Sequence, residues 1–474
     1  MLVVVLVCAS IATLVMTALI SWSATSTRFS RHVLAREQAL QVAEAGIEYA
    51  RWYLAHFQTD YTLGHSEPGP YTYPFSDTSG NEIGSYTLTI TPPPLGSTLV
   101  TIASRGVVTG DSGAARTIVV QLAIPSLAKY AVVANDAMRF GQGTEIFGPL
   151  HSNGGIRFDG TAWNKVTSAV ASYDDPDHSG AVEFGVHTHR DPNAATVNNS
   201  FRPLEAPPQS VPNRTDVFKA GREFPVPAVD FAGIISDLAA IKTGAQSTGN
   251  YFGPSGAQGY LFVLKTNDTY DVYRVQTLTT VPSTQCKNDL NETGWGTWSI
   301  QTKTFIGTYS FPANGLIFAE DMLWVEGQVD TARLTIGAAK FPDTVAQRKS
   351  ITINNDITYS AKDGSSAVAL ISQNNINIGM VSDTTLEVDA ALIAQNGRVG
   401  RYYYSNSCTP YAYRSDITLY GMIATNKRYG FAFTDGTGYA TRTIVYDTSL
   451  LYSPPPNFPL AADSYQIISW KEVE

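Results

Sequence analysis

No charged side chain occurs between Met1 and Thr27, and Met1 to Ile20 (MLVVVLVCASIATLVMTALI) are apolar almost throughout. A helix of about twenty residues is roughly 30 Å long, which matches the hydrocarbon core of a lipid bilayer. An ordered helix of this composition needs lipid, detergent or similar helices around it. The segment therefore predicts a membrane span.

The residues around this segment argue against a signal peptide. A secretory signal has a basic stretch before a shorter apolar region, whereas nothing basic precedes Met1. Arg28, Arg31 and Arg36 follow the segment, and by the positive-inside rule they would place the rest of the chain in the cytoplasm. Only 15% of the residues are charged, and Tyr, Gly, Asn, Ser and Thr are plentiful, as in secreted β-rich proteins. This composition conflicts with a cytoplasmic location. The conflict disappears if a short basic leader is removed, so we expect that Met1 is a processed amino terminus.

The helix is predicted to continue well beyond the apolar segment. Apolar residues recur at spacings of three and four residues and form one stripe along a helix, at Leu40, Ala43, Ile47, Ala50, Leu54 and Phe57. Charged residues lie off this stripe, at Glu37, Glu44, Glu48 and Arg51. We predict one helix from about Leu2 to Phe57, roughly 80 Å long. Its weakest stretch is SWSATST (Ser21–Thr27), because Ser and Thr side chains compete for backbone hydrogen bonds.

An apolar amino-terminal helix that continues into VAEAGIEYA (Val42–Ala50) resembles the type IV pilin-like family, particularly its minor-pilin branch. The resemblance implies that the apolar half of the helix waits in the inner membrane and then packs with copies of itself in the core of an extracellular filament. The residues expected to serve this assembly are Met1, Leu2, Val5, Leu6, Ile11, Leu14, Leu19, Trp22, Leu40, Ala43, Ile47, Ala50 and Leu54.

One residue departs from the family pattern. Many members carry a glutamate at the fifth mature position, thought to pair with a neighbour's amino terminus, and this chain has Val5. Either the subunit caps or initiates a filament, or apolar packing alone holds its filament together. A plain membrane anchor is the other interpretation of the helix.

Residues 61–128 predict a small antiparallel sheet. Strands are expected at Ser85–Thr91, Leu99–Ala103 and Arg116–Leu122, and Gly106 to Arg116 predicts a hairpin with Asp111-Ser-Gly at its tip. Together with the end of the helix, this resembles the small α/β domain of pilins.

From about residue 128, short strands followed by Asn or Gly recur, as in FGPLHSNGGIRFDG (Phe147–Gly160) and TLEVDAALIAQNG (Thr385–Gly397). The 17 residues from Leu334 to Ile351 and the 18 from Ile351 to Ala369 suit the coils of a right-handed parallel β-solenoid. Matching Asn residues are expected to form ladders of side-chain amides. A Rossmann-like fold is excluded because no amphipathic helices alternate with these strands; a sandwich stays open.

Several segments, by their sequences and their order in the chain, also resemble large bacterial pilin-like proteins that carry a polymer-like β-helical domain after a pilin helix. These segments are GPLHSNGGIRF, GLIFAEDMLWVEG, AALIAQNG, VYDTSLLYSPPPNFP and YQIISWKE. This resemblance implies a fold and a place on the cell surface, and it carries no catalytic residues.

We therefore predict an α+β protein in which a long pilin helix and a small antiparallel sheet precede a mainly-β solenoid with an inserted subdomain. The predicted parts are residues 1–60 (helix, with 1–27 as membrane or filament core), 61–128 (small sheet), 129–164 (first coils), 165–310 (insertion), and 311–474 (further coils and cap). Within the insertion we expect a helix over Asp230–Lys242, with Ile234, Ile235, Leu238 and Ile241 on one face, and strands over Gly259–Val275.

Three cysteines, Cys8, Cys286 and Cys408, lie far apart and form no Cys-x-x-Cys motif. Cys286 and Cys408 are expected outside the membrane, where a disulfide between them and two free thiols are equally open alternatives. Cys8 lies in the apolar segment.

The only metal-like cluster lies in SYDDPDHSG and GVHTHR. Its donors are Asp174, Asp175, Asp177, His178, His187 and His189. A His-x-His pair on a strand places both imidazoles on one face, which suits Zn or Cu, and the aspartates suit Ca. The aspartate spacing is not that of an EF-hand, so a polar loop is the favoured interpretation. We assign no cofactor and keep His178, His187, His189 and Asp175 as metal candidates.

Polysaccharide-cleaving solenoids need carboxylates on one sheet face. Candidates are Glu320, Asp321, Glu326 and Asp330, and Glu387 with Asp389, although solvated charges explain them equally well. No Gly-x-Ser-x-Gly, His-Glu-x-x-His or phosphate-binding glycine loop occurs. The tyrosine-rich segment Arg401–Arg414 either stacks on sugars or, as favoured, packs against the insertion or another subunit.

The expected function is that of a non-enzymatic structural subunit of an extracellular type IV pilus-like filament. Expected partners are its own copies, other pilins, the inner-membrane assembly machinery and a surface or glycan ligand. The net charge of -9 and the lack of a basic patch argue against nucleic acid. The alternative is a membrane-anchored solenoid that binds or cleaves carbohydrate and does not polymerise.

Overall fold

The computed structural model describes residues 1–194, 196–231 and 238–473. The chain forms two compact units. The first consists of Met1–Pro94, Thr98–Ile124 and Ala462–Glu474, and the second of Leu95–Ser97 and Pro125–Ala461. The carboxyl terminus was predicted to cap the solenoid, but it returns to the first unit instead.

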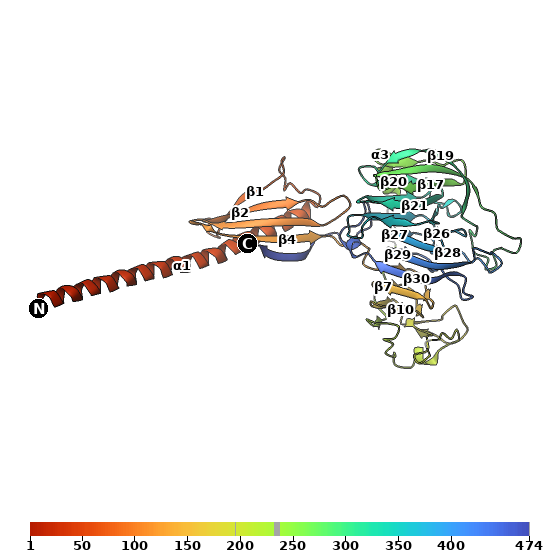
Figure 1. The fold of residues 1–474 in the computed structure, drawn as a ribbon, viewed down its shortest axis with the longest axis horizontal. Coiled ribbons are helices and arrows are strands. Elements are labelled where there is room, and N and C mark those ends of the chain that lie inside the picture. The colour runs from red at the N-terminus through yellow and green to blue at the C-terminus, as the bar shows by residue number, and fades with distance from the viewer. Residues whose placement is uncertain (195, 232–237, 474) are drawn as a thin grey trace. The chain divides into compact units, whose positions relative to one another are not determined.

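The first unit begins with the helix α1, which runs unbroken from Leu2 to His56 and confirms the predicted single helix (Figure 1). Ser21–Thr27 is helical in the isolated chain. There the hydroxyls of Thr25 and Thr27 donate hydrogen bonds to the carbonyls of Ser21 and Ser23, four residues earlier. The helix ends at Phe57, whose backbone N–H still donates to the Tyr53 carbonyl.

A five-stranded antiparallel sheet packs on the second half of α1. Its strands, in spatial order, are β1 (Tyr71–Ser76), β2 (Glu82–Thr91), β3 (Val100–Val108), β4 (Asp111–Ala123) and β31 (Gln466–Val473). The predicted tip of the β3–β4 hairpin is wrong. Val108 pairs with Asp111, so Thr109 and Gly110 make the turn, and the φ of +92° at Gly110 suits glycine.

The strand β31 explains why the carboxyl terminus leaves the second unit. It pairs with β4 from Gln466↔Ala123 to Val473↔Thr117. The pairing gives β4 a second neighbour, so its backbone groups are not left at an open sheet edge. The sequence YQIISWKE contains this strand but does not indicate its partner.

Small residues bring the helix close to this sheet. Gly46, in the VAEAGIEYA segment, lies where a Cβ atom would be 2.3 Å from the Ser104 hydroxyl and 2.8 Å from the Tyr86 ring. A Cβ atom on Gly106 would lie 2.1 Å from the backbone oxygen of Ala39. Both positions therefore require glycine for a close approach between helix and sheet.

The second unit is built mainly from parallel strands stacked in ladders (Figure 1). The longest ladder runs β15 (Arg222–Glu223), β11 (Val166–Ser168), β8 (Leu150–Ser152), β5 (Val132–Ala134), β29 (Tyr413–Thr425), β27 (Thr385–Ala394), β25 (Ala367–Ser372), β22 (Arg333–Ala338), β20 (Leu316–Ala319) and β16 (Asn250–Phe252). A second ladder runs β10 (Thr161–Ala162), β7 (Thr144–Phe147), β30 (Gly438–Tyr446), β29, β27, β24 (Ile357–Tyr359), β21 (Leu323–Val329) and β17 (Gly259–Leu264). Two shorter ladders form a third side. One contains β28 (Val399–Arg401), β26 (Ile376–Ile378) and β23 (Ile351–Thr352). The other contains β6 (Met138–Phe140), β9 (Ile156–Phe158) and β14 (Val186–His187).

The chain does not follow the longest ladder from end to end. It starts in the middle at β5, extends through β8 and β11 to β15, re-enters at the opposite end with β16, and returns to lie beside β5 through β29. In Figure 1, β7 and β10 therefore lie at one end of this unit and β19 and β20 at the other. The pairing of β5 with β29 joins residues that are far apart in the sequence.

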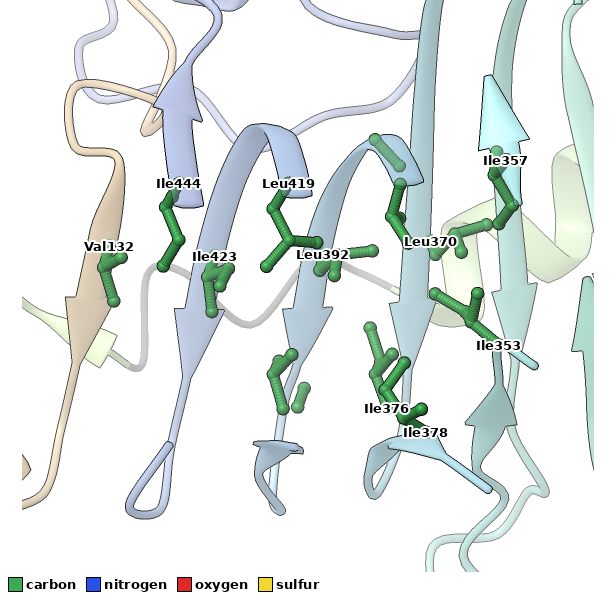
Figure 2. Packing of buried hydrophobic residues seen from close by; sticks show 14 of the residues in the cluster. Val132, Ile353, Ile357, Leu370, Ile376, Ile378, Leu392, Leu419, Ile423 and Ile444 are labelled. Atoms are coloured by element: carbon green, nitrogen blue, oxygen red, sulfur yellow. The ribbon is translucent and has the colours of Figure 1, made fainter. Parts of the chain in front are cut away.

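Aliphatic residues stack inside the ladders. Val132 pairs with Ile423, Ile423 with Leu392, and Leu392 with Leu370, and all four are buried. Figure 2 shows these side chains in one layer across neighbouring strands. At about 25 cal/mol per Å² of buried apolar surface, such columns are the main source of stability for this unit.

The predicted coil length of 17 or 18 residues is wrong. Leu334 pairs with Val368 rather than with Ile351, which lies in another ladder beside Leu323 and Ile376. Only the stacked strands must match in register, so the loops between them vary in length without disturbing the ladders. The predicted amide ladder is confirmed: Asn153 donates to Asn135 and Asn135 donates to Asn426, each over 2.9 Å.

The predicted insertion, residues 165–310, is only partly separate from the ladders. β11, β15, β16 and β17 extend them, whereas β18 (Thr269–Leu278) and β19 (Ile300–Ser310) continue antiparallel from β17. The helix predicted over Asp230–Lys242 overlaps α3 (Leu238–Ser247) only from Leu238 to Lys242, and α3 buries Leu238 and Ile241. Ile234 and Ile235 lie outside the described residues. Among the described residues, short 3-10 helices occur at Pro203–Glu205, Val345–Gln347 and Thr448–Leu451.

Candidate functional sites: an exposed apolar helix and a buried histidine cluster

In the described part of the chain, no other segment buries the first half of α1. Every residue from Met1 to Arg31 is exposed. Its most apolar 18-residue window has a mean hydropathy of 2.7, and none of that window is buried. The exposed members of the predicted assembly set are Met1, Leu2, Val5, Leu6, Ile11, Leu14, Leu19 and Trp22. A helix of this length and composition is sufficient to cross a membrane.

The second half of the same helix packs on its own sheet. Ala43, Ile47, Ala50 and Leu54 are buried against residues of β2, β3 and β4, Leu40 is partly buried, and Phe57 is exposed. These buried residues were predicted to serve assembly together with the first half. The structure instead gives them a role within the chain, because contacts to the sheet already cover them.

The metal candidates of the sequence meet at one buried place in the second unit. His187 is on β14, His189 follows it at the alternate position, and Asp175 and His178 lie in the loop after β12 (Ser172–Tyr173). β12 pairs antiparallel with β13 (Glu183–Phe184), which adds Glu183 to the group. His187, His189 and Glu183 are 0% exposed and Asp175 is 2% exposed.

Ring nitrogens and carboxylate oxygens lie close together in this histidine cluster. Its members are Asp175, His178, Glu183, His187 and His189. The Nε2 atom of His178 is 3.0 Å from Glu183 Oε2 and 3.6 Å from Asp175 Oδ2. His189 Nε2 is 2.9 Å from Glu183 Oε1. His187 Nε2 is 3.2 Å from Glu183 Oε2 and 3.6 Å from Asp175 Oδ2. One ligand atom each from Asp175, His178, Glu183 and His189 lies within 4.8 Å of all the others.

The opposite ring nitrogens are held by backbone carbonyls. His189 Nδ1 is 2.7 Å from the Asn198 oxygen, His187 Nδ1 is 3.2 Å from the Phe184 oxygen, and His178 Nδ1 is 3.3 Å from the Ser179 oxygen. A carbonyl oxygen only accepts hydrogen bonds, so these contacts favour the proton on Nδ1 in each ring.

Arg157 and Asp159, from β9 and the residue after it, complete the surroundings. Arg157 Nε donates to Asp159 Oδ2 over 2.8 Å, and its Nη1 is 3.5 Å from Asp175 Oδ2. Burial by itself raises the pKa of Asp175, but the facing His187 ring, the Asp177 backbone N–H and Arg157 outweigh it, so the pKa lies well below its usual range. Burial likewise raises the pKa of Glu183, and the neighbouring histidines lower it overall. Both groups are therefore held as carboxylates.

Sequence reasoning missed Glu183 and included two aspartates that do not belong to the cluster. Asp174 is exposed, and Asp177 forms ion pairs with Arg139 and Arg428. Glu183 was within reach of the sequence, because it lies four residues before His187 and close to the His-x-His pair. Arg157 had no such signal, because its strand is brought in by the ladder.

The other carboxylate candidates are engaged by neighbouring side chains. Glu320 pairs with Lys242 and accepts a hydrogen bond from Tyr251, and Asp321 accepts from Ser255 and lies 3.3 Å from Lys349. Glu326 accepts from Asn355, and Asp330 is exposed. Lys362 bridges Glu387 and Asp389 at 2.6 and 2.8 Å.

A disulfide joins Cys286 to Cys408, 122 residues apart in the sequence. It lies in a cluster with Tyr402 and Tyr404, both buried, so much of the tyrosine-rich segment packs against residues 281–298 of the predicted insertion. Tyr413, by contrast, is exposed. Cys8 is free and exposed.

A cavity of about 740 Å³ in the second unit has Asp159 and Asp177 among its lining residues. Four arginines contribute to its lining, Arg139, Arg398, Arg428 and Arg442, together with aromatic residues that include Phe431 and Phe433. Arg139 and Arg428 pair with Asp177, and Arg398 pairs with Glu292. These residues come from several distant segments, so no local motif could have predicted the cavity.

Comparison with known proteins places few constraints on the chain. No family model matches it, and no curated protein matches it. Among solved structures, it is similar to the crystal structure of the competence-associated pilin ComZ from Thermus thermophilus, with 14% sequence identity, coverage of 93% of this chain and 98% of that chain, and a TM-score of 0.31. A similarity at this TM-score carries no argument about function.

Proposed function

We propose that this chain is a structural subunit of an extracellular type IV pilus-like filament. One observation carries the proposal: the first half of α1 exposes an apolar surface that is uncharged as far as Thr27, while the second half packs one face on its own sheet. The exposed half would lie in the inner membrane before assembly and among copies of itself in the filament.

The transfer from lipid to filament replaces lipid contacts with protein contacts. Because both surroundings are apolar, the hydrophobic effect favours neither strongly, and close helix packing must stabilise the product. Extraction from the bilayer would then need the inner-membrane assembly machinery, while the finished filament could persist. With Val5 in place of a glutamate, apolar packing would act without an ion pair at that position.

In the filament, we expect Ser21–Thr27 to unwind. The hydroxyls of Thr25 and Thr27 already compete for carbonyls of the helix, which weakens it locally. A filament structure in which this stretch remains a continuous helix would contradict this detail.

The second unit would be a β-solenoid head displayed on the outside. The parallel ladders and stacked aliphatic columns support this assignment, since each coil needs contacts only with its neighbours. Adhesion to a surface or glycan is the role we assign to this head, and the cavity lined by arginine and aromatic side chains is its candidate binding site.

We infer no enzymatic role. Apart from the exposed Asp330, the carboxylates that sequence analysis considered for polysaccharide cleavage are held by lysine, serine, tyrosine or asparagine side chains. A pair of catalytic carboxylates needs one group kept free to donate a proton.

Negative-stain microscopy of filaments sheared from cells, with antibody labelling of the second unit, tests the proposal. We expect labelled filaments. Labelled protein found only as single molecules in the membrane fraction would overturn the filament role and favour the alternative, a membrane-anchored solenoid that binds or cleaves carbohydrate.

A further inference from the structure

We propose that Asp175, His178, Glu183 and His189 bind one divalent transition-metal ion of the zinc class, with His187 as an adjacent donor. The inference does not depend on the filament role. It starts from the histidine cluster, where donor atoms from three short segments converge in a buried place.

The Nε2 atoms of the three rings all face carboxyl oxygens of the cluster. With Nδ1–H donating to a backbone carbonyl, the Nε2 atom of a neutral ring presents a lone pair. Each Nε2 atom faces a carboxyl oxygen of Glu183, which also presents lone pairs. Two acceptors about 3 Å apart repel each other unless a proton or a cation lies between them. Three such contacts meet here.

Polar atoms in and beside the histidine cluster lack hydrogen-bond partners among the described residues. His187 Nε2, Asp175 Oδ2 and Arg157 Nη1 are buried and have no hydrogen-bond partner within the described protein. Leaving a buried polar group without a partner destabilises the fold. His187 Nε2 and Asp175 Oδ2 point toward one another across 3.6 Å, so a shared cation would satisfy both.

The spacing of the donors suits a tetrahedral ion. Ligands at about 2.0–2.2 Å from a tetrahedral zinc ion lie roughly 3.3–3.6 Å from each other. Nitrogen–oxygen separations in the cluster range from 2.9 to 3.6 Å. These nitrogen–oxygen contacts suit that spacing, and the remaining donor pairs, which lie within 4.8 Å of one another, must draw closer when an ion binds.

Charge favours a divalent ion. In this buried set, Arg157 lies between Asp159 and Asp175, and no lysine or arginine forms an ion pair with Glu183 in the part of the chain that the structure describes. The buried set therefore holds three acidic side chains, Asp159, Asp175 and Glu183, against one arginine. A divalent cation would offset this acidic excess, which is costly to bury uncompensated.

The donor set indicates both the kind of metal and its role. Imidazole nitrogen suits zinc, copper or nickel and does not suit calcium or magnesium, which take oxygen ligands. Four protein donors in a closed, buried place are typical of a structural site. Such an ion would tie β13 and β14, which have two residues each, to the loop that carries Asp175 and His178.

The test uses the full-length protein in detergent. After dialysis against a chelator, zinc or cobalt is titrated back, metal content is measured by mass spectrometry, and melting is followed with and without metal. We expect one bound ion per chain, visible absorption bands of tetrahedral cobalt, and a higher melting temperature with metal, because an ion that binds only the folded state stabilises it.

Two variants locate the ion. His189→Gln and Glu183→Gln remove one donor each and should weaken binding at least about tenfold, since even outer-shell changes cost that much. His151→Gln is the matched control, because His151 is also buried but both of its ring nitrogens have partners, Thr167 and Asn153. It should bind metal like the wild type.

Two results would overturn the proposal. In the first, the wild-type chain, whose folding is not in question, takes up no zinc or cobalt and has the same melting temperature with and without chelator. Protonated histidines would then hold the cluster together. Alternatively, His189→Gln and Glu183→Gln bind as tightly as the wild type, and the ion lies elsewhere.

Discussion

The two halves of α1 have the same secondary structure and opposite surroundings. From Met1 to Arg31 every residue is exposed, whereas Ala39, Ala43, Gly46 and Ala50 are buried on the sheet of their own unit. The first half is uncharged to Thr27 and apolar on all sides, and the second half carries a stripe with charges off it. The comparison shows that one continuous helix can have its carboxyl-terminal half covered by its own chain. Its apolar amino-terminal half must be covered by other molecules.

The largest effect is expected from a charge in the first half. Leu14→Lys places an ammonium group in the middle of the apolar segment, where burial in lipid costs about 2.5–3.5 kcal/mol. We expect the chain to disappear from the sheared filament fraction. Glu44→Lys, on the exposed side of the second half, is the control and should assemble. Normal amounts of Leu14→Lys in filaments would show that the first half is not the assembly surface.

A cavity in the second half should weaken folding instead of assembly. Leu54 is 0% exposed, so Leu54→Ala should lower the free energy of unfolding of the first unit by about 2–5 kcal/mol. Denaturant titration of the full-length protein in detergent measures this loss. Trp52→Ala, at a position 57% exposed, is the control and should change stability little. Equal effects of the two substitutions would contradict the assigned buried face.

A smaller loss is expected where helix and sheet meet. The Cβ atom of Gly46→Ala would overlap the Ser104 hydroxyl. Overpacking costs about 1–3 kcal/mol, from which a helix-propensity gain of about 1 kcal/mol is subtracted. Adding Ser104→Ala should restore part of the stability, because the Ser104 hydroxyl has no hydrogen-bond partner among the described residues. A stabilised single variant would show that the close approach is absent in solution.

The smallest effect concerns the end of the buried half. Hydrogen bonds from Thr62 and Tyr53 lower the pKa of Asp60 to about 2. Because the folded pKa lies below the usual value of about 3.9, Asp60 stabilises the fold above that value and loses this contribution as the pH falls toward 2. Asp60→Asn should flatten the dependence of the melting temperature on pH in this window. If the dependence of the melting temperature on pH were unchanged in Asp60→Asn, Asp60 would not contribute to the stability of the fold in this pH window.

The parts of the fold that the sequence predicted are those set by local pattern. An uncharged apolar run and a stripe of three and four spacing determine a helix regardless of the rest of the chain, and alternation determined the strands β2 to β4. The return of β31 to β4 and the meeting of β5 with β29 depend on register between distant segments. The local sequence of a strand does not identify such a distant partner, since many strands of similar composition could pair at the same position.

The histidine cluster shows the same limit on a smaller scale. His187 and His189 were found because alternation on a strand puts both on one face. Glu183 was overlooked because a single acidic residue near a strand usually faces solvent, and here the pairing of β12 with β13 turns it inward. Arg157 came from the neighbouring strand β9, whose register against β14 no spacing rule reveals.

The most direct measurement is a helical reconstruction, at side-chain resolution, of filaments sheared from cells that make this chain. The account predicts that residues 1–27 lie buried against the same residues of neighbouring copies, while Ala43 to Leu54 stay packed on their own sheet. Filaments in which residues 1–27 contact no other copy, or a chain found only singly in the bilayer, would contradict it.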